Sequence, residues 1–165
     1  MTENESFQRA NAAANRFIAY RPRSEAEVRQ RLRKRFPPDL VERVVSELVE
    51  RSVIDDVGFA RLWRNSRESL NPRSAGVVRR ELWAKGVSKE TAQEAVSDLD
   101  DSDGALRAGR KFARRLENAD YSTYRRRLWG HLQRRGFGQS VVRRTIEVLW
   151  EELHGGEESQ ETDES

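Results

Sequence analysis

The chain of 165 residues contains no cysteine, which excludes disulfide bonds and thiolate metal sites. It has only two histidines, His131 and His154, and this shortage also excludes common zinc sites and Cys–His nucleophile pairs. No stretch approaches the roughly 18 consecutive apolar residues of a membrane span, and the N-terminal MTENESFQRA lacks the apolar segment of a signal peptide. We therefore expect a cytoplasmic protein that does not associate with membranes.

Motifs for catalysis and cofactor binding are missing as well. There is no Gly-rich phosphate loop followed by Lys and Ser or Thr, so an ATPase has no support. The acidic stretch DLDDSDGALRAG fails as a calcium loop, because Asp103 stands where glycine is required and Gly109 where the bidentate glutamate belongs. His131 lies between Leu128 and Leu132 and is expected to be a packing or surface residue. The sequence therefore predicts no catalytic residue, no metal site and no cofactor.

Proline and glycine are scarce, with 4 and 10 residues, and the apolar residues between them recur every three or four positions. This spacing is typical of amphipathic helices, and no segment shows the sustained alternation of a strand. Charged residues make up 36% of the chain, above the rough average of a quarter in globular proteins, which favours thin helical layers over one deep core. The predicted fold class is all-α.

Helix starts and stops can be placed from the same pattern. Ser24 followed by Glu27 has the spacing of a capping box, and either Asp55 or Asp56 is expected to cap the helix that carries a buried stripe of Phe59, Leu62 and Trp63. The predicted helices lie at 7–20, 24–35, 39–51, 55–70, 74–85, 88–99, 102–118, 121–135 and 138–153.

The sequence also repeats itself at a spacing of 50 residues. The matching sets are Val28, Val78 and Leu128, then Leu32, Leu82 and Leu132, then Ser24 and Ser74. Gly86 matches Gly136, whereas Phe36 takes the place of this glycine in the first copy. One extra residue then follows in the later copies, after which the matching resumes. Small units of this kind bury little area alone and are stabilised by packing against their neighbours. We therefore predict an elongated array of three tandem three-helix repeats.

The predicted boundaries follow from this repeat. The repeats are expected at 7–54, 55–100 and 101–153, between a flexible N-terminus at 1–6 and a disordered acidic tail at 154–165. The tryptophans are expected to pack at helix junctions; they are Trp63, Trp83, Trp129 and Trp150.

The net charge of +3 hides an uneven distribution. The first 6 and the last 12 residues carry 7 of the 28 acidic residues and no Lys or Arg, so 31 basic residues face 21 acidic ones in the rest of the chain. Arginine outnumbers lysine by 27 to 4. A planar guanidinium suits phosphates and carboxylates, so a surface rich in arginine favours polyanionic or acidic partners.

Arginine clusters are the candidate binding residues. Neighbouring arginines on a helix point about 100° apart, so runs of them form a charged face that neutralises phosphates without reading bases. The stretch RQRLRKR at 29–35 has acidic neighbours, and we leave open whether it is a contact surface or a solvated face. No acidic residue lies within 125–144, which favours a contact surface there. The candidate residues are Arg79, Arg80, Arg125, Arg126, Arg127, Arg134, Arg135, Arg143 and Arg144.

Three segments together resemble the RecX family of bacterial regulatory proteins. They are VIDDVGFARLW at 53–63, YRPRSEAEVRQRL at 20–32 and RRLWGHLQRRGF at 126–137, and the resemblance covers about residues 10–153. It implies the tandem three-helix fold and a non-enzymatic modulator of the RecA recombinase in DNA repair and recombination. Members of this family bind the RecA nucleoprotein filament along its groove, and some also bind DNA directly.

Three functional hypotheses follow. The leading one is a protein, monomeric when free, that binds the RecA filament and inhibits its ATPase and strand exchange. The second is a stand-alone helical protein that binds single-stranded or double-stranded DNA without sequence preference, and the third is a protein–protein scaffold whose binding survives high salt. The acidic tail could compete with DNA for the basic face, or it could serve only as a solubilising segment.

Overall fold

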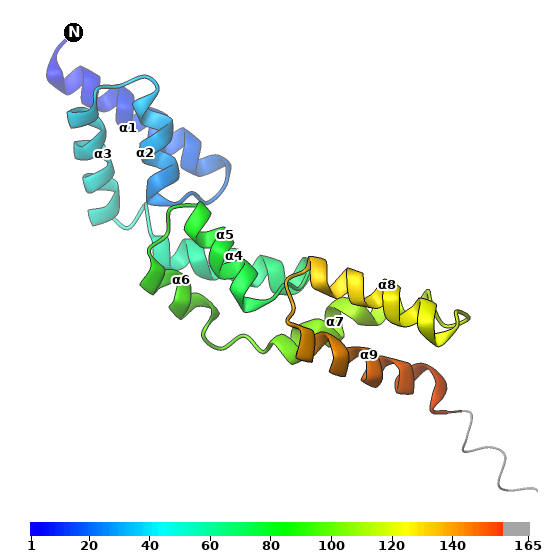
Figure 1. Cartoon of the computed structure of the whole chain (residues 1–165). Coiled ribbons are helices and arrows are strands. Elements are labelled where there is room, and N and C mark those ends of the chain that lie inside the picture. Colours follow the sequence, from blue (N-terminus) through cyan, green and yellow to red (C-terminus); the bar gives the residue numbers. More distant parts are fainter. Residues whose placement is uncertain (157–165) are drawn as a thin grey trace, which may run out of the picture. The chain divides into compact units, whose positions relative to one another are not determined.

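A computed structural model describes residues 1–156, and within this range the chain forms nine α-helices and no strand (Figure 1). The helices are α1 (Glu3–Tyr20), α2 (Glu25–Arg33), α3 (Pro38–Glu50), α4 (Asp56–Leu70), α5 (Ala75–Ala84), α6 (Lys89–Val96), α7 (Asp101–Arg114), α8 (Tyr121–Arg134) and α9 (Gln139–His154). The all-α prediction is confirmed. We call α1–α3 the first repeat, α4–α6 the second and α7–α9 the third. Most of the predicted acidic tail, residues 157–165, lies outside the described range.

The first helix starts earlier than the sequence predicted. The Thr2 hydroxyl accepts a hydrogen bond from the Glu5 backbone N–H (3.2 Å), and the Glu5 carboxylate accepts one from the Thr2 N–H (2.9 Å). This reciprocal capping box satisfies two N–H groups that a helix start leaves without partners. Residues 3–6, which we expected to be flexible, therefore form the first turn of α1.

The turn between α3 and α4 combines an uncommon backbone conformation with a capping aspartate. Ser52 has a positive φ of 57°, and the N–H groups of Val53 and Ile54 both donate to the Leu48 carbonyl (2.9 and 3.1 Å). Ile54 is buried, whereas Val53 is exposed to water. Of the two aspartates predicted as possible caps, Asp55 is the one whose carboxylate accepts a hydrogen bond from the Gly58 N–H (3.1 Å).

The predicted buried stripe of α4 is partly wrong. Phe59 is buried as expected and Trp63 is half-buried, but Leu62 is 55% exposed and Ala60 is fully buried in its place. The helix turns about 100° per residue, so the face centred between Phe59 and Ala60 leaves Leu62 on a flank.

The described chain divides into two compact units, each holding one complete repeat and part of the second repeat. The first unit comprises Met1–Arg64 and Arg79–Val96, and the second comprises Asn65–Val78 and the residues from Ser97 onward. The predicted repeat boundaries after residues 54 and 100 stay predictions.

The core of the first unit lies between α1, α2 and α3. Its buried side chains include Ala10, Ala14, Val28, Leu32, Val41, Val44, Val45 and Leu48. The two alanines on α1 are fully buried, and their small size lets the other two helices approach closely. Pro38 occupies the first turn of α3, where its missing N–H costs nothing because the helix has no acceptor for it there.

The core of the second unit repeats this arrangement between α7, α8 and α9. Its buried side chains include Ala105, Ala113, Tyr124, Leu128, Leu132, Val142, Ile146 and Leu149. A Cβ on Gly109 would lie only 3.0 Å from Leu149 Cδ1, so this position on α7 has room for glycine and little more. The buried Tyr124 hydroxyl donates to the Ile146 carbonyl (2.8 Å), and burial raises the pKa of Tyr124.

Candidate functional site

The nine candidate arginines fall into two groups. Arg79 and Arg80 lie on α5 in the first unit. The other seven belong to the third repeat in the second unit, on α8, just after it and on α9. The second group is therefore the larger cluster that one compact unit brings together.

On α8 the buried and exposed positions separate cleanly. Tyr124, Leu128 and Leu132 form the buried stripe, one helical turn apart. Arginines lie off this stripe, and those exposed to water on α8 and α9 are Arg125, Arg126, Arg127, Arg134, Arg143 and Arg144. We call these six the third-repeat arginine face. Arg127 and Arg134 are two turns apart and so lie on the same flank of α8.

This face has little negative charge to balance it. Residues 121–146 contain no Asp or Glu, and among the described residues the one ion pair made by the six is Arg144 with Glu147, at 4.0 Å. The nearby Asp120 is occupied as the cap of α8, since it accepts hydrogen bonds from the Thr123 N–H and hydroxyl. These bonds, with a smaller contribution from Arg126, lower the pKa of Asp120. The face can therefore accept phosphates or carboxylates from a partner.

Arg135 is positioned differently from its neighbours. Its Nε donates to Asn71 Oδ1 (3.1 Å) and its Nη1 to the His131 carbonyl (3.1 Å), and the side chain is half-buried. Burial, followed by repulsion from Arg73 and Arg134, lowers the pKa of Arg135. These contacts give Arg135 a structural role within the second unit.

The two candidates on α5 also differ from each other. Arg79 is half-buried, donates to Gln93 Oε1 (2.8 Å) and lies 5.2 Å from the centre of the Trp83 ring. Arg80 is exposed and makes no ion pair with any residue of the range 1–156. Arg80 is therefore the residue on α5 that is available to a partner.

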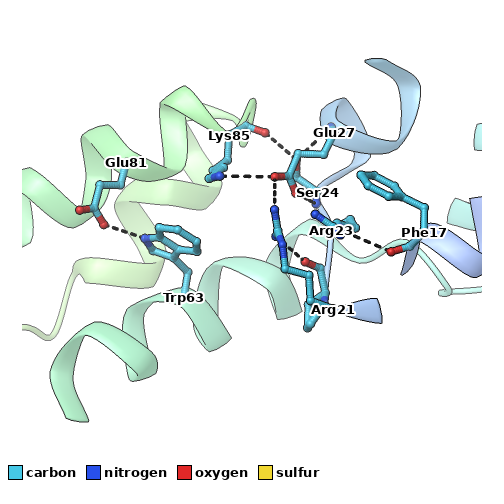
Figure 2. A network of polar contacts seen from close by, with 9 residues as sticks. Phe17, Arg21, Arg23, Ser24, Glu27, Trp63, Glu81 and Lys85 are labelled. Carbon is cyan, nitrogen blue, oxygen red and sulfur yellow. Dashed lines mark hydrogen bonds and ion pairs between the residues drawn. The ribbon is translucent and has the colours of Figure 1, made fainter. Parts of the chain in front are cut away.

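A junction between the first and second repeats lies inside the first unit (Figure 2). The buried Ser24 hydroxyl, which caps α2, donates to the Lys85 carbonyl at the end of α5 (2.5 Å). The Glu25 N–H donates to Asp56 Oδ1 at the start of α4 (2.8 Å). Burial raises the pKa of Asp56, and repulsion from Glu25 and Asp55 adds to this against the lowering effect of the Glu25 hydrogen bond.

Glu27 adds charge to this junction. It accepts from the Ser24 N–H (3.0 Å) and pairs with Arg21 (3.1 Å) and Lys85 (3.5 Å), as Figure 2 shows. Burial works to raise the pKa of Glu27, but the hydrogen bonds and the two cations outweigh it and lower that pKa. The capping box predicted from the sequence is thus also part of a contact between repeats.

A second junction of the same design lies inside the second unit. The Ser74 N–H donates to the Arg135 carbonyl after α8 (3.1 Å), and the Ala75 N–H donates to Asp101 Oδ1 at the start of α7 (2.8 Å). Both junctions place a glycine of positive φ against the previous middle helix, Gly86 at 81° and Gly136 at 87°.

The two glycines cannot carry a side chain. A Cβ would lie 2.2 Å from Ala26 Cβ at Gly86, and 2.1 Å from Val77 Cγ2 at Gly136. The sequence repeat marks these glycines and the matching serines but does not show their role. The signal was their recurrence at a spacing of 50 residues, with Phe36 in the place of this glycine in the first repeat.

The histidines and tryptophans are mostly structural. His131 stacks on Phe112 with ring centres 4.2 Å apart, and its Nε2 lies 3.0 Å from the Ala108 carbonyl, as expected of a packing residue. Trp63 donates to Glu81 (2.8 Å), and Trp150 stacks on His154. Trp83 is 39% exposed, so the expectation of junction packing is wrong for this residue.

Within the described range, no group of three or more His, Cys, Asp or Glu side chains could hold a metal ion. None of the helices found between residues 1 and 156 is long and apolar enough to cross a membrane.

Taken together, the fold and site define a tandem array of three-helix repeats that carries an arginine face on its third repeat. Sequence profiles described as the first, second and third three-helix domains of RecX match residues 10–48, 55–96 and 100–146. The chain belongs to the RecX family.

Relatives of known name agree with this assignment. "Regulatory protein RecX" of Prosthecochloris aestuarii is 33% identical over 141 residues, covering 83% of this chain and 93% of the relative. The protein of the same name from Amycolatopsis mediterranei is 32% identical over 153 residues, covering 90% and 86%. The crystal structure of RecX from Lactobacillus salivarius shares the fold, with a TM-score of 0.77 at 19% identity over 88% of this chain and 97% of that one.

Proposed function

We propose that the chain binds the RecA nucleoprotein filament and lowers its ATPase and strand-exchange activity. The observation that carries this proposal is the third-repeat arginine face, whose six exposed guanidinium groups have one weak acidic partner among the described residues. Membership of the RecX family, whose relatives are named regulatory proteins, supports RecA as the partner.

The proposed mechanism is electrostatic and steric. The arginines meet acidic groups of RecA or phosphates of the bound strand, because both supply the negative charge that the face lacks. Several weak contacts on one array act together, since the first contact raises the effective concentration of the others. The bound array then hinders the subunit movements that accompany ATP hydrolysis. No step in this mechanism requires a catalytic residue in the regulator itself.

The direct test is RecA ATP hydrolysis on single-stranded DNA with increasing amounts of the protein. We expect the rate to fall to a plateau. The double variant Arg126→Glu/Arg127→Glu should need about tenfold more protein for half-maximal inhibition, because two cationic contacts become repulsive. The double variant Arg51→Glu/Arg61→Glu is the control, since it changes the charge equally at exposed sites outside the third repeat: Arg51 lies just after α3, where it pairs with Glu47, and Arg61 lies on α4. An unchanged ATPase rate at saturating protein contradicts the proposal.

A stand-alone nucleic-acid-binding protein is the second candidate, and the same arginine face favours it. This alternative predicts gel-shift binding to DNA without RecA, with an affinity that falls steeply with salt. Strong DNA binding combined with no effect on RecA would favour it over the RecA proposal. Binding to RecA that persists at high salt would instead indicate a protein–protein scaffold.

A further inference from the structure

A second basic region lies in the first repeat, in a groove bordered by α1 and α2. The groove has a volume of about 430 Å³. Four arginines line it, Arg16, Arg23, Arg31 and Arg35, and none of its lining residues is acidic. Two of them, Arg31 and Arg35, belong to the stretch RQRLRKR at 29–35, which the sequence alone left undecided between a contact surface and a solvated face.

The groove continues along α1 toward the N-terminus. A smaller cavity of about 180 Å³ shares Arg16, Arg35 and Phe36 with it and adds Arg9. Arg9 and Arg16 are seven residues apart on α1, which places them on one flank with a rise of about 10 Å between them. In the part of the chain that the structure describes, none of the five arginines forms an ion pair. The charge is therefore spread along a line and left for a ligand.

Aromatic rings hold two of the guanidinium groups in place. The Arg23 guanidinium lies 3.9 Å from the centre of the Phe17 ring, and Arg31 lies 5.3 Å from the same ring. Arg23 also donates from Nε to the Phe17 carbonyl (3.2 Å), a contact drawn in Figure 2. Burial and then repulsion from Arg21 lower the pKa of Arg23, against the opposing attraction of Glu27.

Tyr20 at the rim of the groove has no packing role that explains it. It is the last residue of α1 and is 87% exposed, whereas Phe17 and Phe36 pack partly against the core. Exposed aromatic rings beside a line of cations are the combination that binds single-stranded nucleic acid, because bases stack on the ring while the cations follow the phosphates.

We propose that the α1–α2 groove binds a segment of single-stranded DNA, with phosphates against Arg16, Arg31 and Arg35 and a base stacked on Tyr20. The volume lies within the range of small-ligand pockets, and the extension toward Arg9 favours a strand over a single nucleotide. The choice of DNA over RNA rests on the proposed function. A nucleic-acid strand would contact the Tyr20 ring through a base as well as the arginines through its phosphates. An acidic peptide would contact the arginines alone.

The first test measures binding of a fluorescent oligodeoxythymidylate to the whole chain by anisotropy, without RecA. An abasic strand of equal length and charge serves as the comparison. We expect Tyr20→Ala to weaken oligothymidylate binding by roughly tenfold and abasic binding very little, because stacking contributes about 1–3 kcal/mol per base. Since Tyr20 is exposed, this variant should fold, which circular dichroism verifies.

The charge component is tested through salt. The variant Arg16→Gln/Arg35→Gln should reduce the slope of log affinity against log salt by about 1.4, at about 0.7 per lost phosphate contact on a single strand. Arg51→Gln/Arg61→Gln, the matched control, should leave the slope unchanged. If the groove variants bind as wild type while Arg126→Glu/Arg127→Glu loses DNA binding, the groove assignment is overturned.

A second test locates the base directly. Irradiating the complex with an oligomer that contains 5-iododeoxyuridine should cross-link the stacked ring, so the adduct is expected on the tryptic peptide FIAYRPR, residues 17–23, because trypsin does not cleave between Arg21 and Pro22. An adduct found only on peptides with Trp83 or Trp129 overturns the proposal. The proposal is also overturned if polyglutamate displaces the oligomer as readily as the abasic strand does and Tyr20→Ala has no effect on binding. None of these readouts involves RecA, so their failure is separate from failure of the proposed regulation.

Discussion

The first and third repeats share one design and differ in how they treat their arginines. In the first, Arg29 on α2 donates to both oxygens of Glu42 on α3 (2.9 and 3.3 Å), and Arg33 donates to the same carboxylate (3.1 Å). In the third, the 50-residue spacing and the one extra residue place Trp129 and Arg143 at the positions of Arg29 and Glu42. The face between the second and third helices is therefore neutralised in one repeat and cationic in the other.

The middle repeat stands between these two cases, because Arg79 donates there to the neutral Gln93. One helical scaffold thus carries three electrostatic states at equivalent positions. At these equivalent positions, the arginine is paired with an acid only where the packed partner helix supplies one.

The ends of the middle helices differ as well. The second and third repeats end this helix with a glycine that lies against the preceding repeat, and the first repeat has Phe36 there, partly buried against its own core. At the other end, buried Ser24 and Ser74 cap the middle helices at the junctions, whereas the exposed Asp120 caps α8. The caps at the two junctions are therefore buried, whereas the cap of α8 is exposed.

Exchanging the caps should have the largest effect. Ser24→Asp keeps a helix cap but buries a carboxylate against the Lys85 carbonyl, with no added donor, and is expected to cost about 3–5 kcal/mol of stability. Asp120→Ser should change little, since both residues cap well in water. Urea unfolding followed by circular dichroism measures both, and equal losses would remove the distinction between junction and end caps.

The second-largest loss of stability is expected when a methyl group is added at the junction glycine Gly136. Gly136→Ala combines a left-handed backbone with overlap against Val77 and should cost about 2–4 kcal/mol. Gly76→Ala is the control in the same unit, because its Cβ would meet nothing closer than Ser74 Oγ at 4.0 Å. That change should stabilise α5 by about 0.5–1 kcal/mol. The same denaturation measurement should therefore give opposite signs for the two glycines.

Exchanging charges between the repeats tests the electrostatic contrast. Arg143→Glu should weaken binding to single-stranded DNA by severalfold and lower the salt slope by about 0.7. Glu42→Arg frees Arg29 and Arg33 from their partner and should strengthen binding by a similar factor. Anisotropy titrations over a range of salt measure both. If Glu42→Arg binds DNA no better than the wild type, the pairing with Glu42 is not what separates the first-repeat face from the third-repeat face.

The smallest expected effect concerns pH and the second unit, which contains both histidines. Burial, aided by Arg135 and Arg134 against the Ala108 hydrogen bond, lowers the pKa of His131. The unfolded chain keeps the ordinary value near 6.5, so it takes up a proton first as pH falls. Stability should decrease below about pH 6.5 and level off below the folded pKa.

His131→Gln isolates this contribution. The variant keeps a side-chain donor for the Ala108 carbonyl but does not titrate, so its stability should fall less than that of the wild type between about pH 7 and pH 5. Identical pH dependence of urea unfolding in the two proteins would contradict the buried neutral histidine.

Much of the architecture could be predicted because its signals are local. The apolar spacing of Val28 and Leu32, the capping pair Ser24 and Glu27, and the helix start at Asp55 or Asp56 depend on residues within one or two helical turns. The structure confirms the first two and selects Asp55 as the cap. The sequence pattern placed the start of α1 too late because Thr2 and Glu5 form a capping box in a segment whose one apolar residue is Met1. Leu62 was misplaced because two adjacent small and aromatic residues, Ala60 and Phe59, shift the buried face of α4.

The candidate site was less predictable. Arg126 and Arg127 are exposed as a helical run suggests, but Arg135 beside Arg134 is held by Asn71, which is 64 residues away in sequence. The groove of the first repeat joins side chains from two helices, and no single stretch reveals that Arg16 and Arg35 line the same cavity. Pairing between distant side chains depends on helix packing, which a local pattern does not encode.

By itself, the sequence determined the helices, their caps and the threefold repeat, because each depends on residues a few positions apart. Only the tertiary structure decided which arginines are neutralised, why Gly86 and Gly136 lack a side chain, and where the basic groove lies. These properties depend on which side chains meet across helices, and such contacts are set by packing between residues that are far apart along the chain.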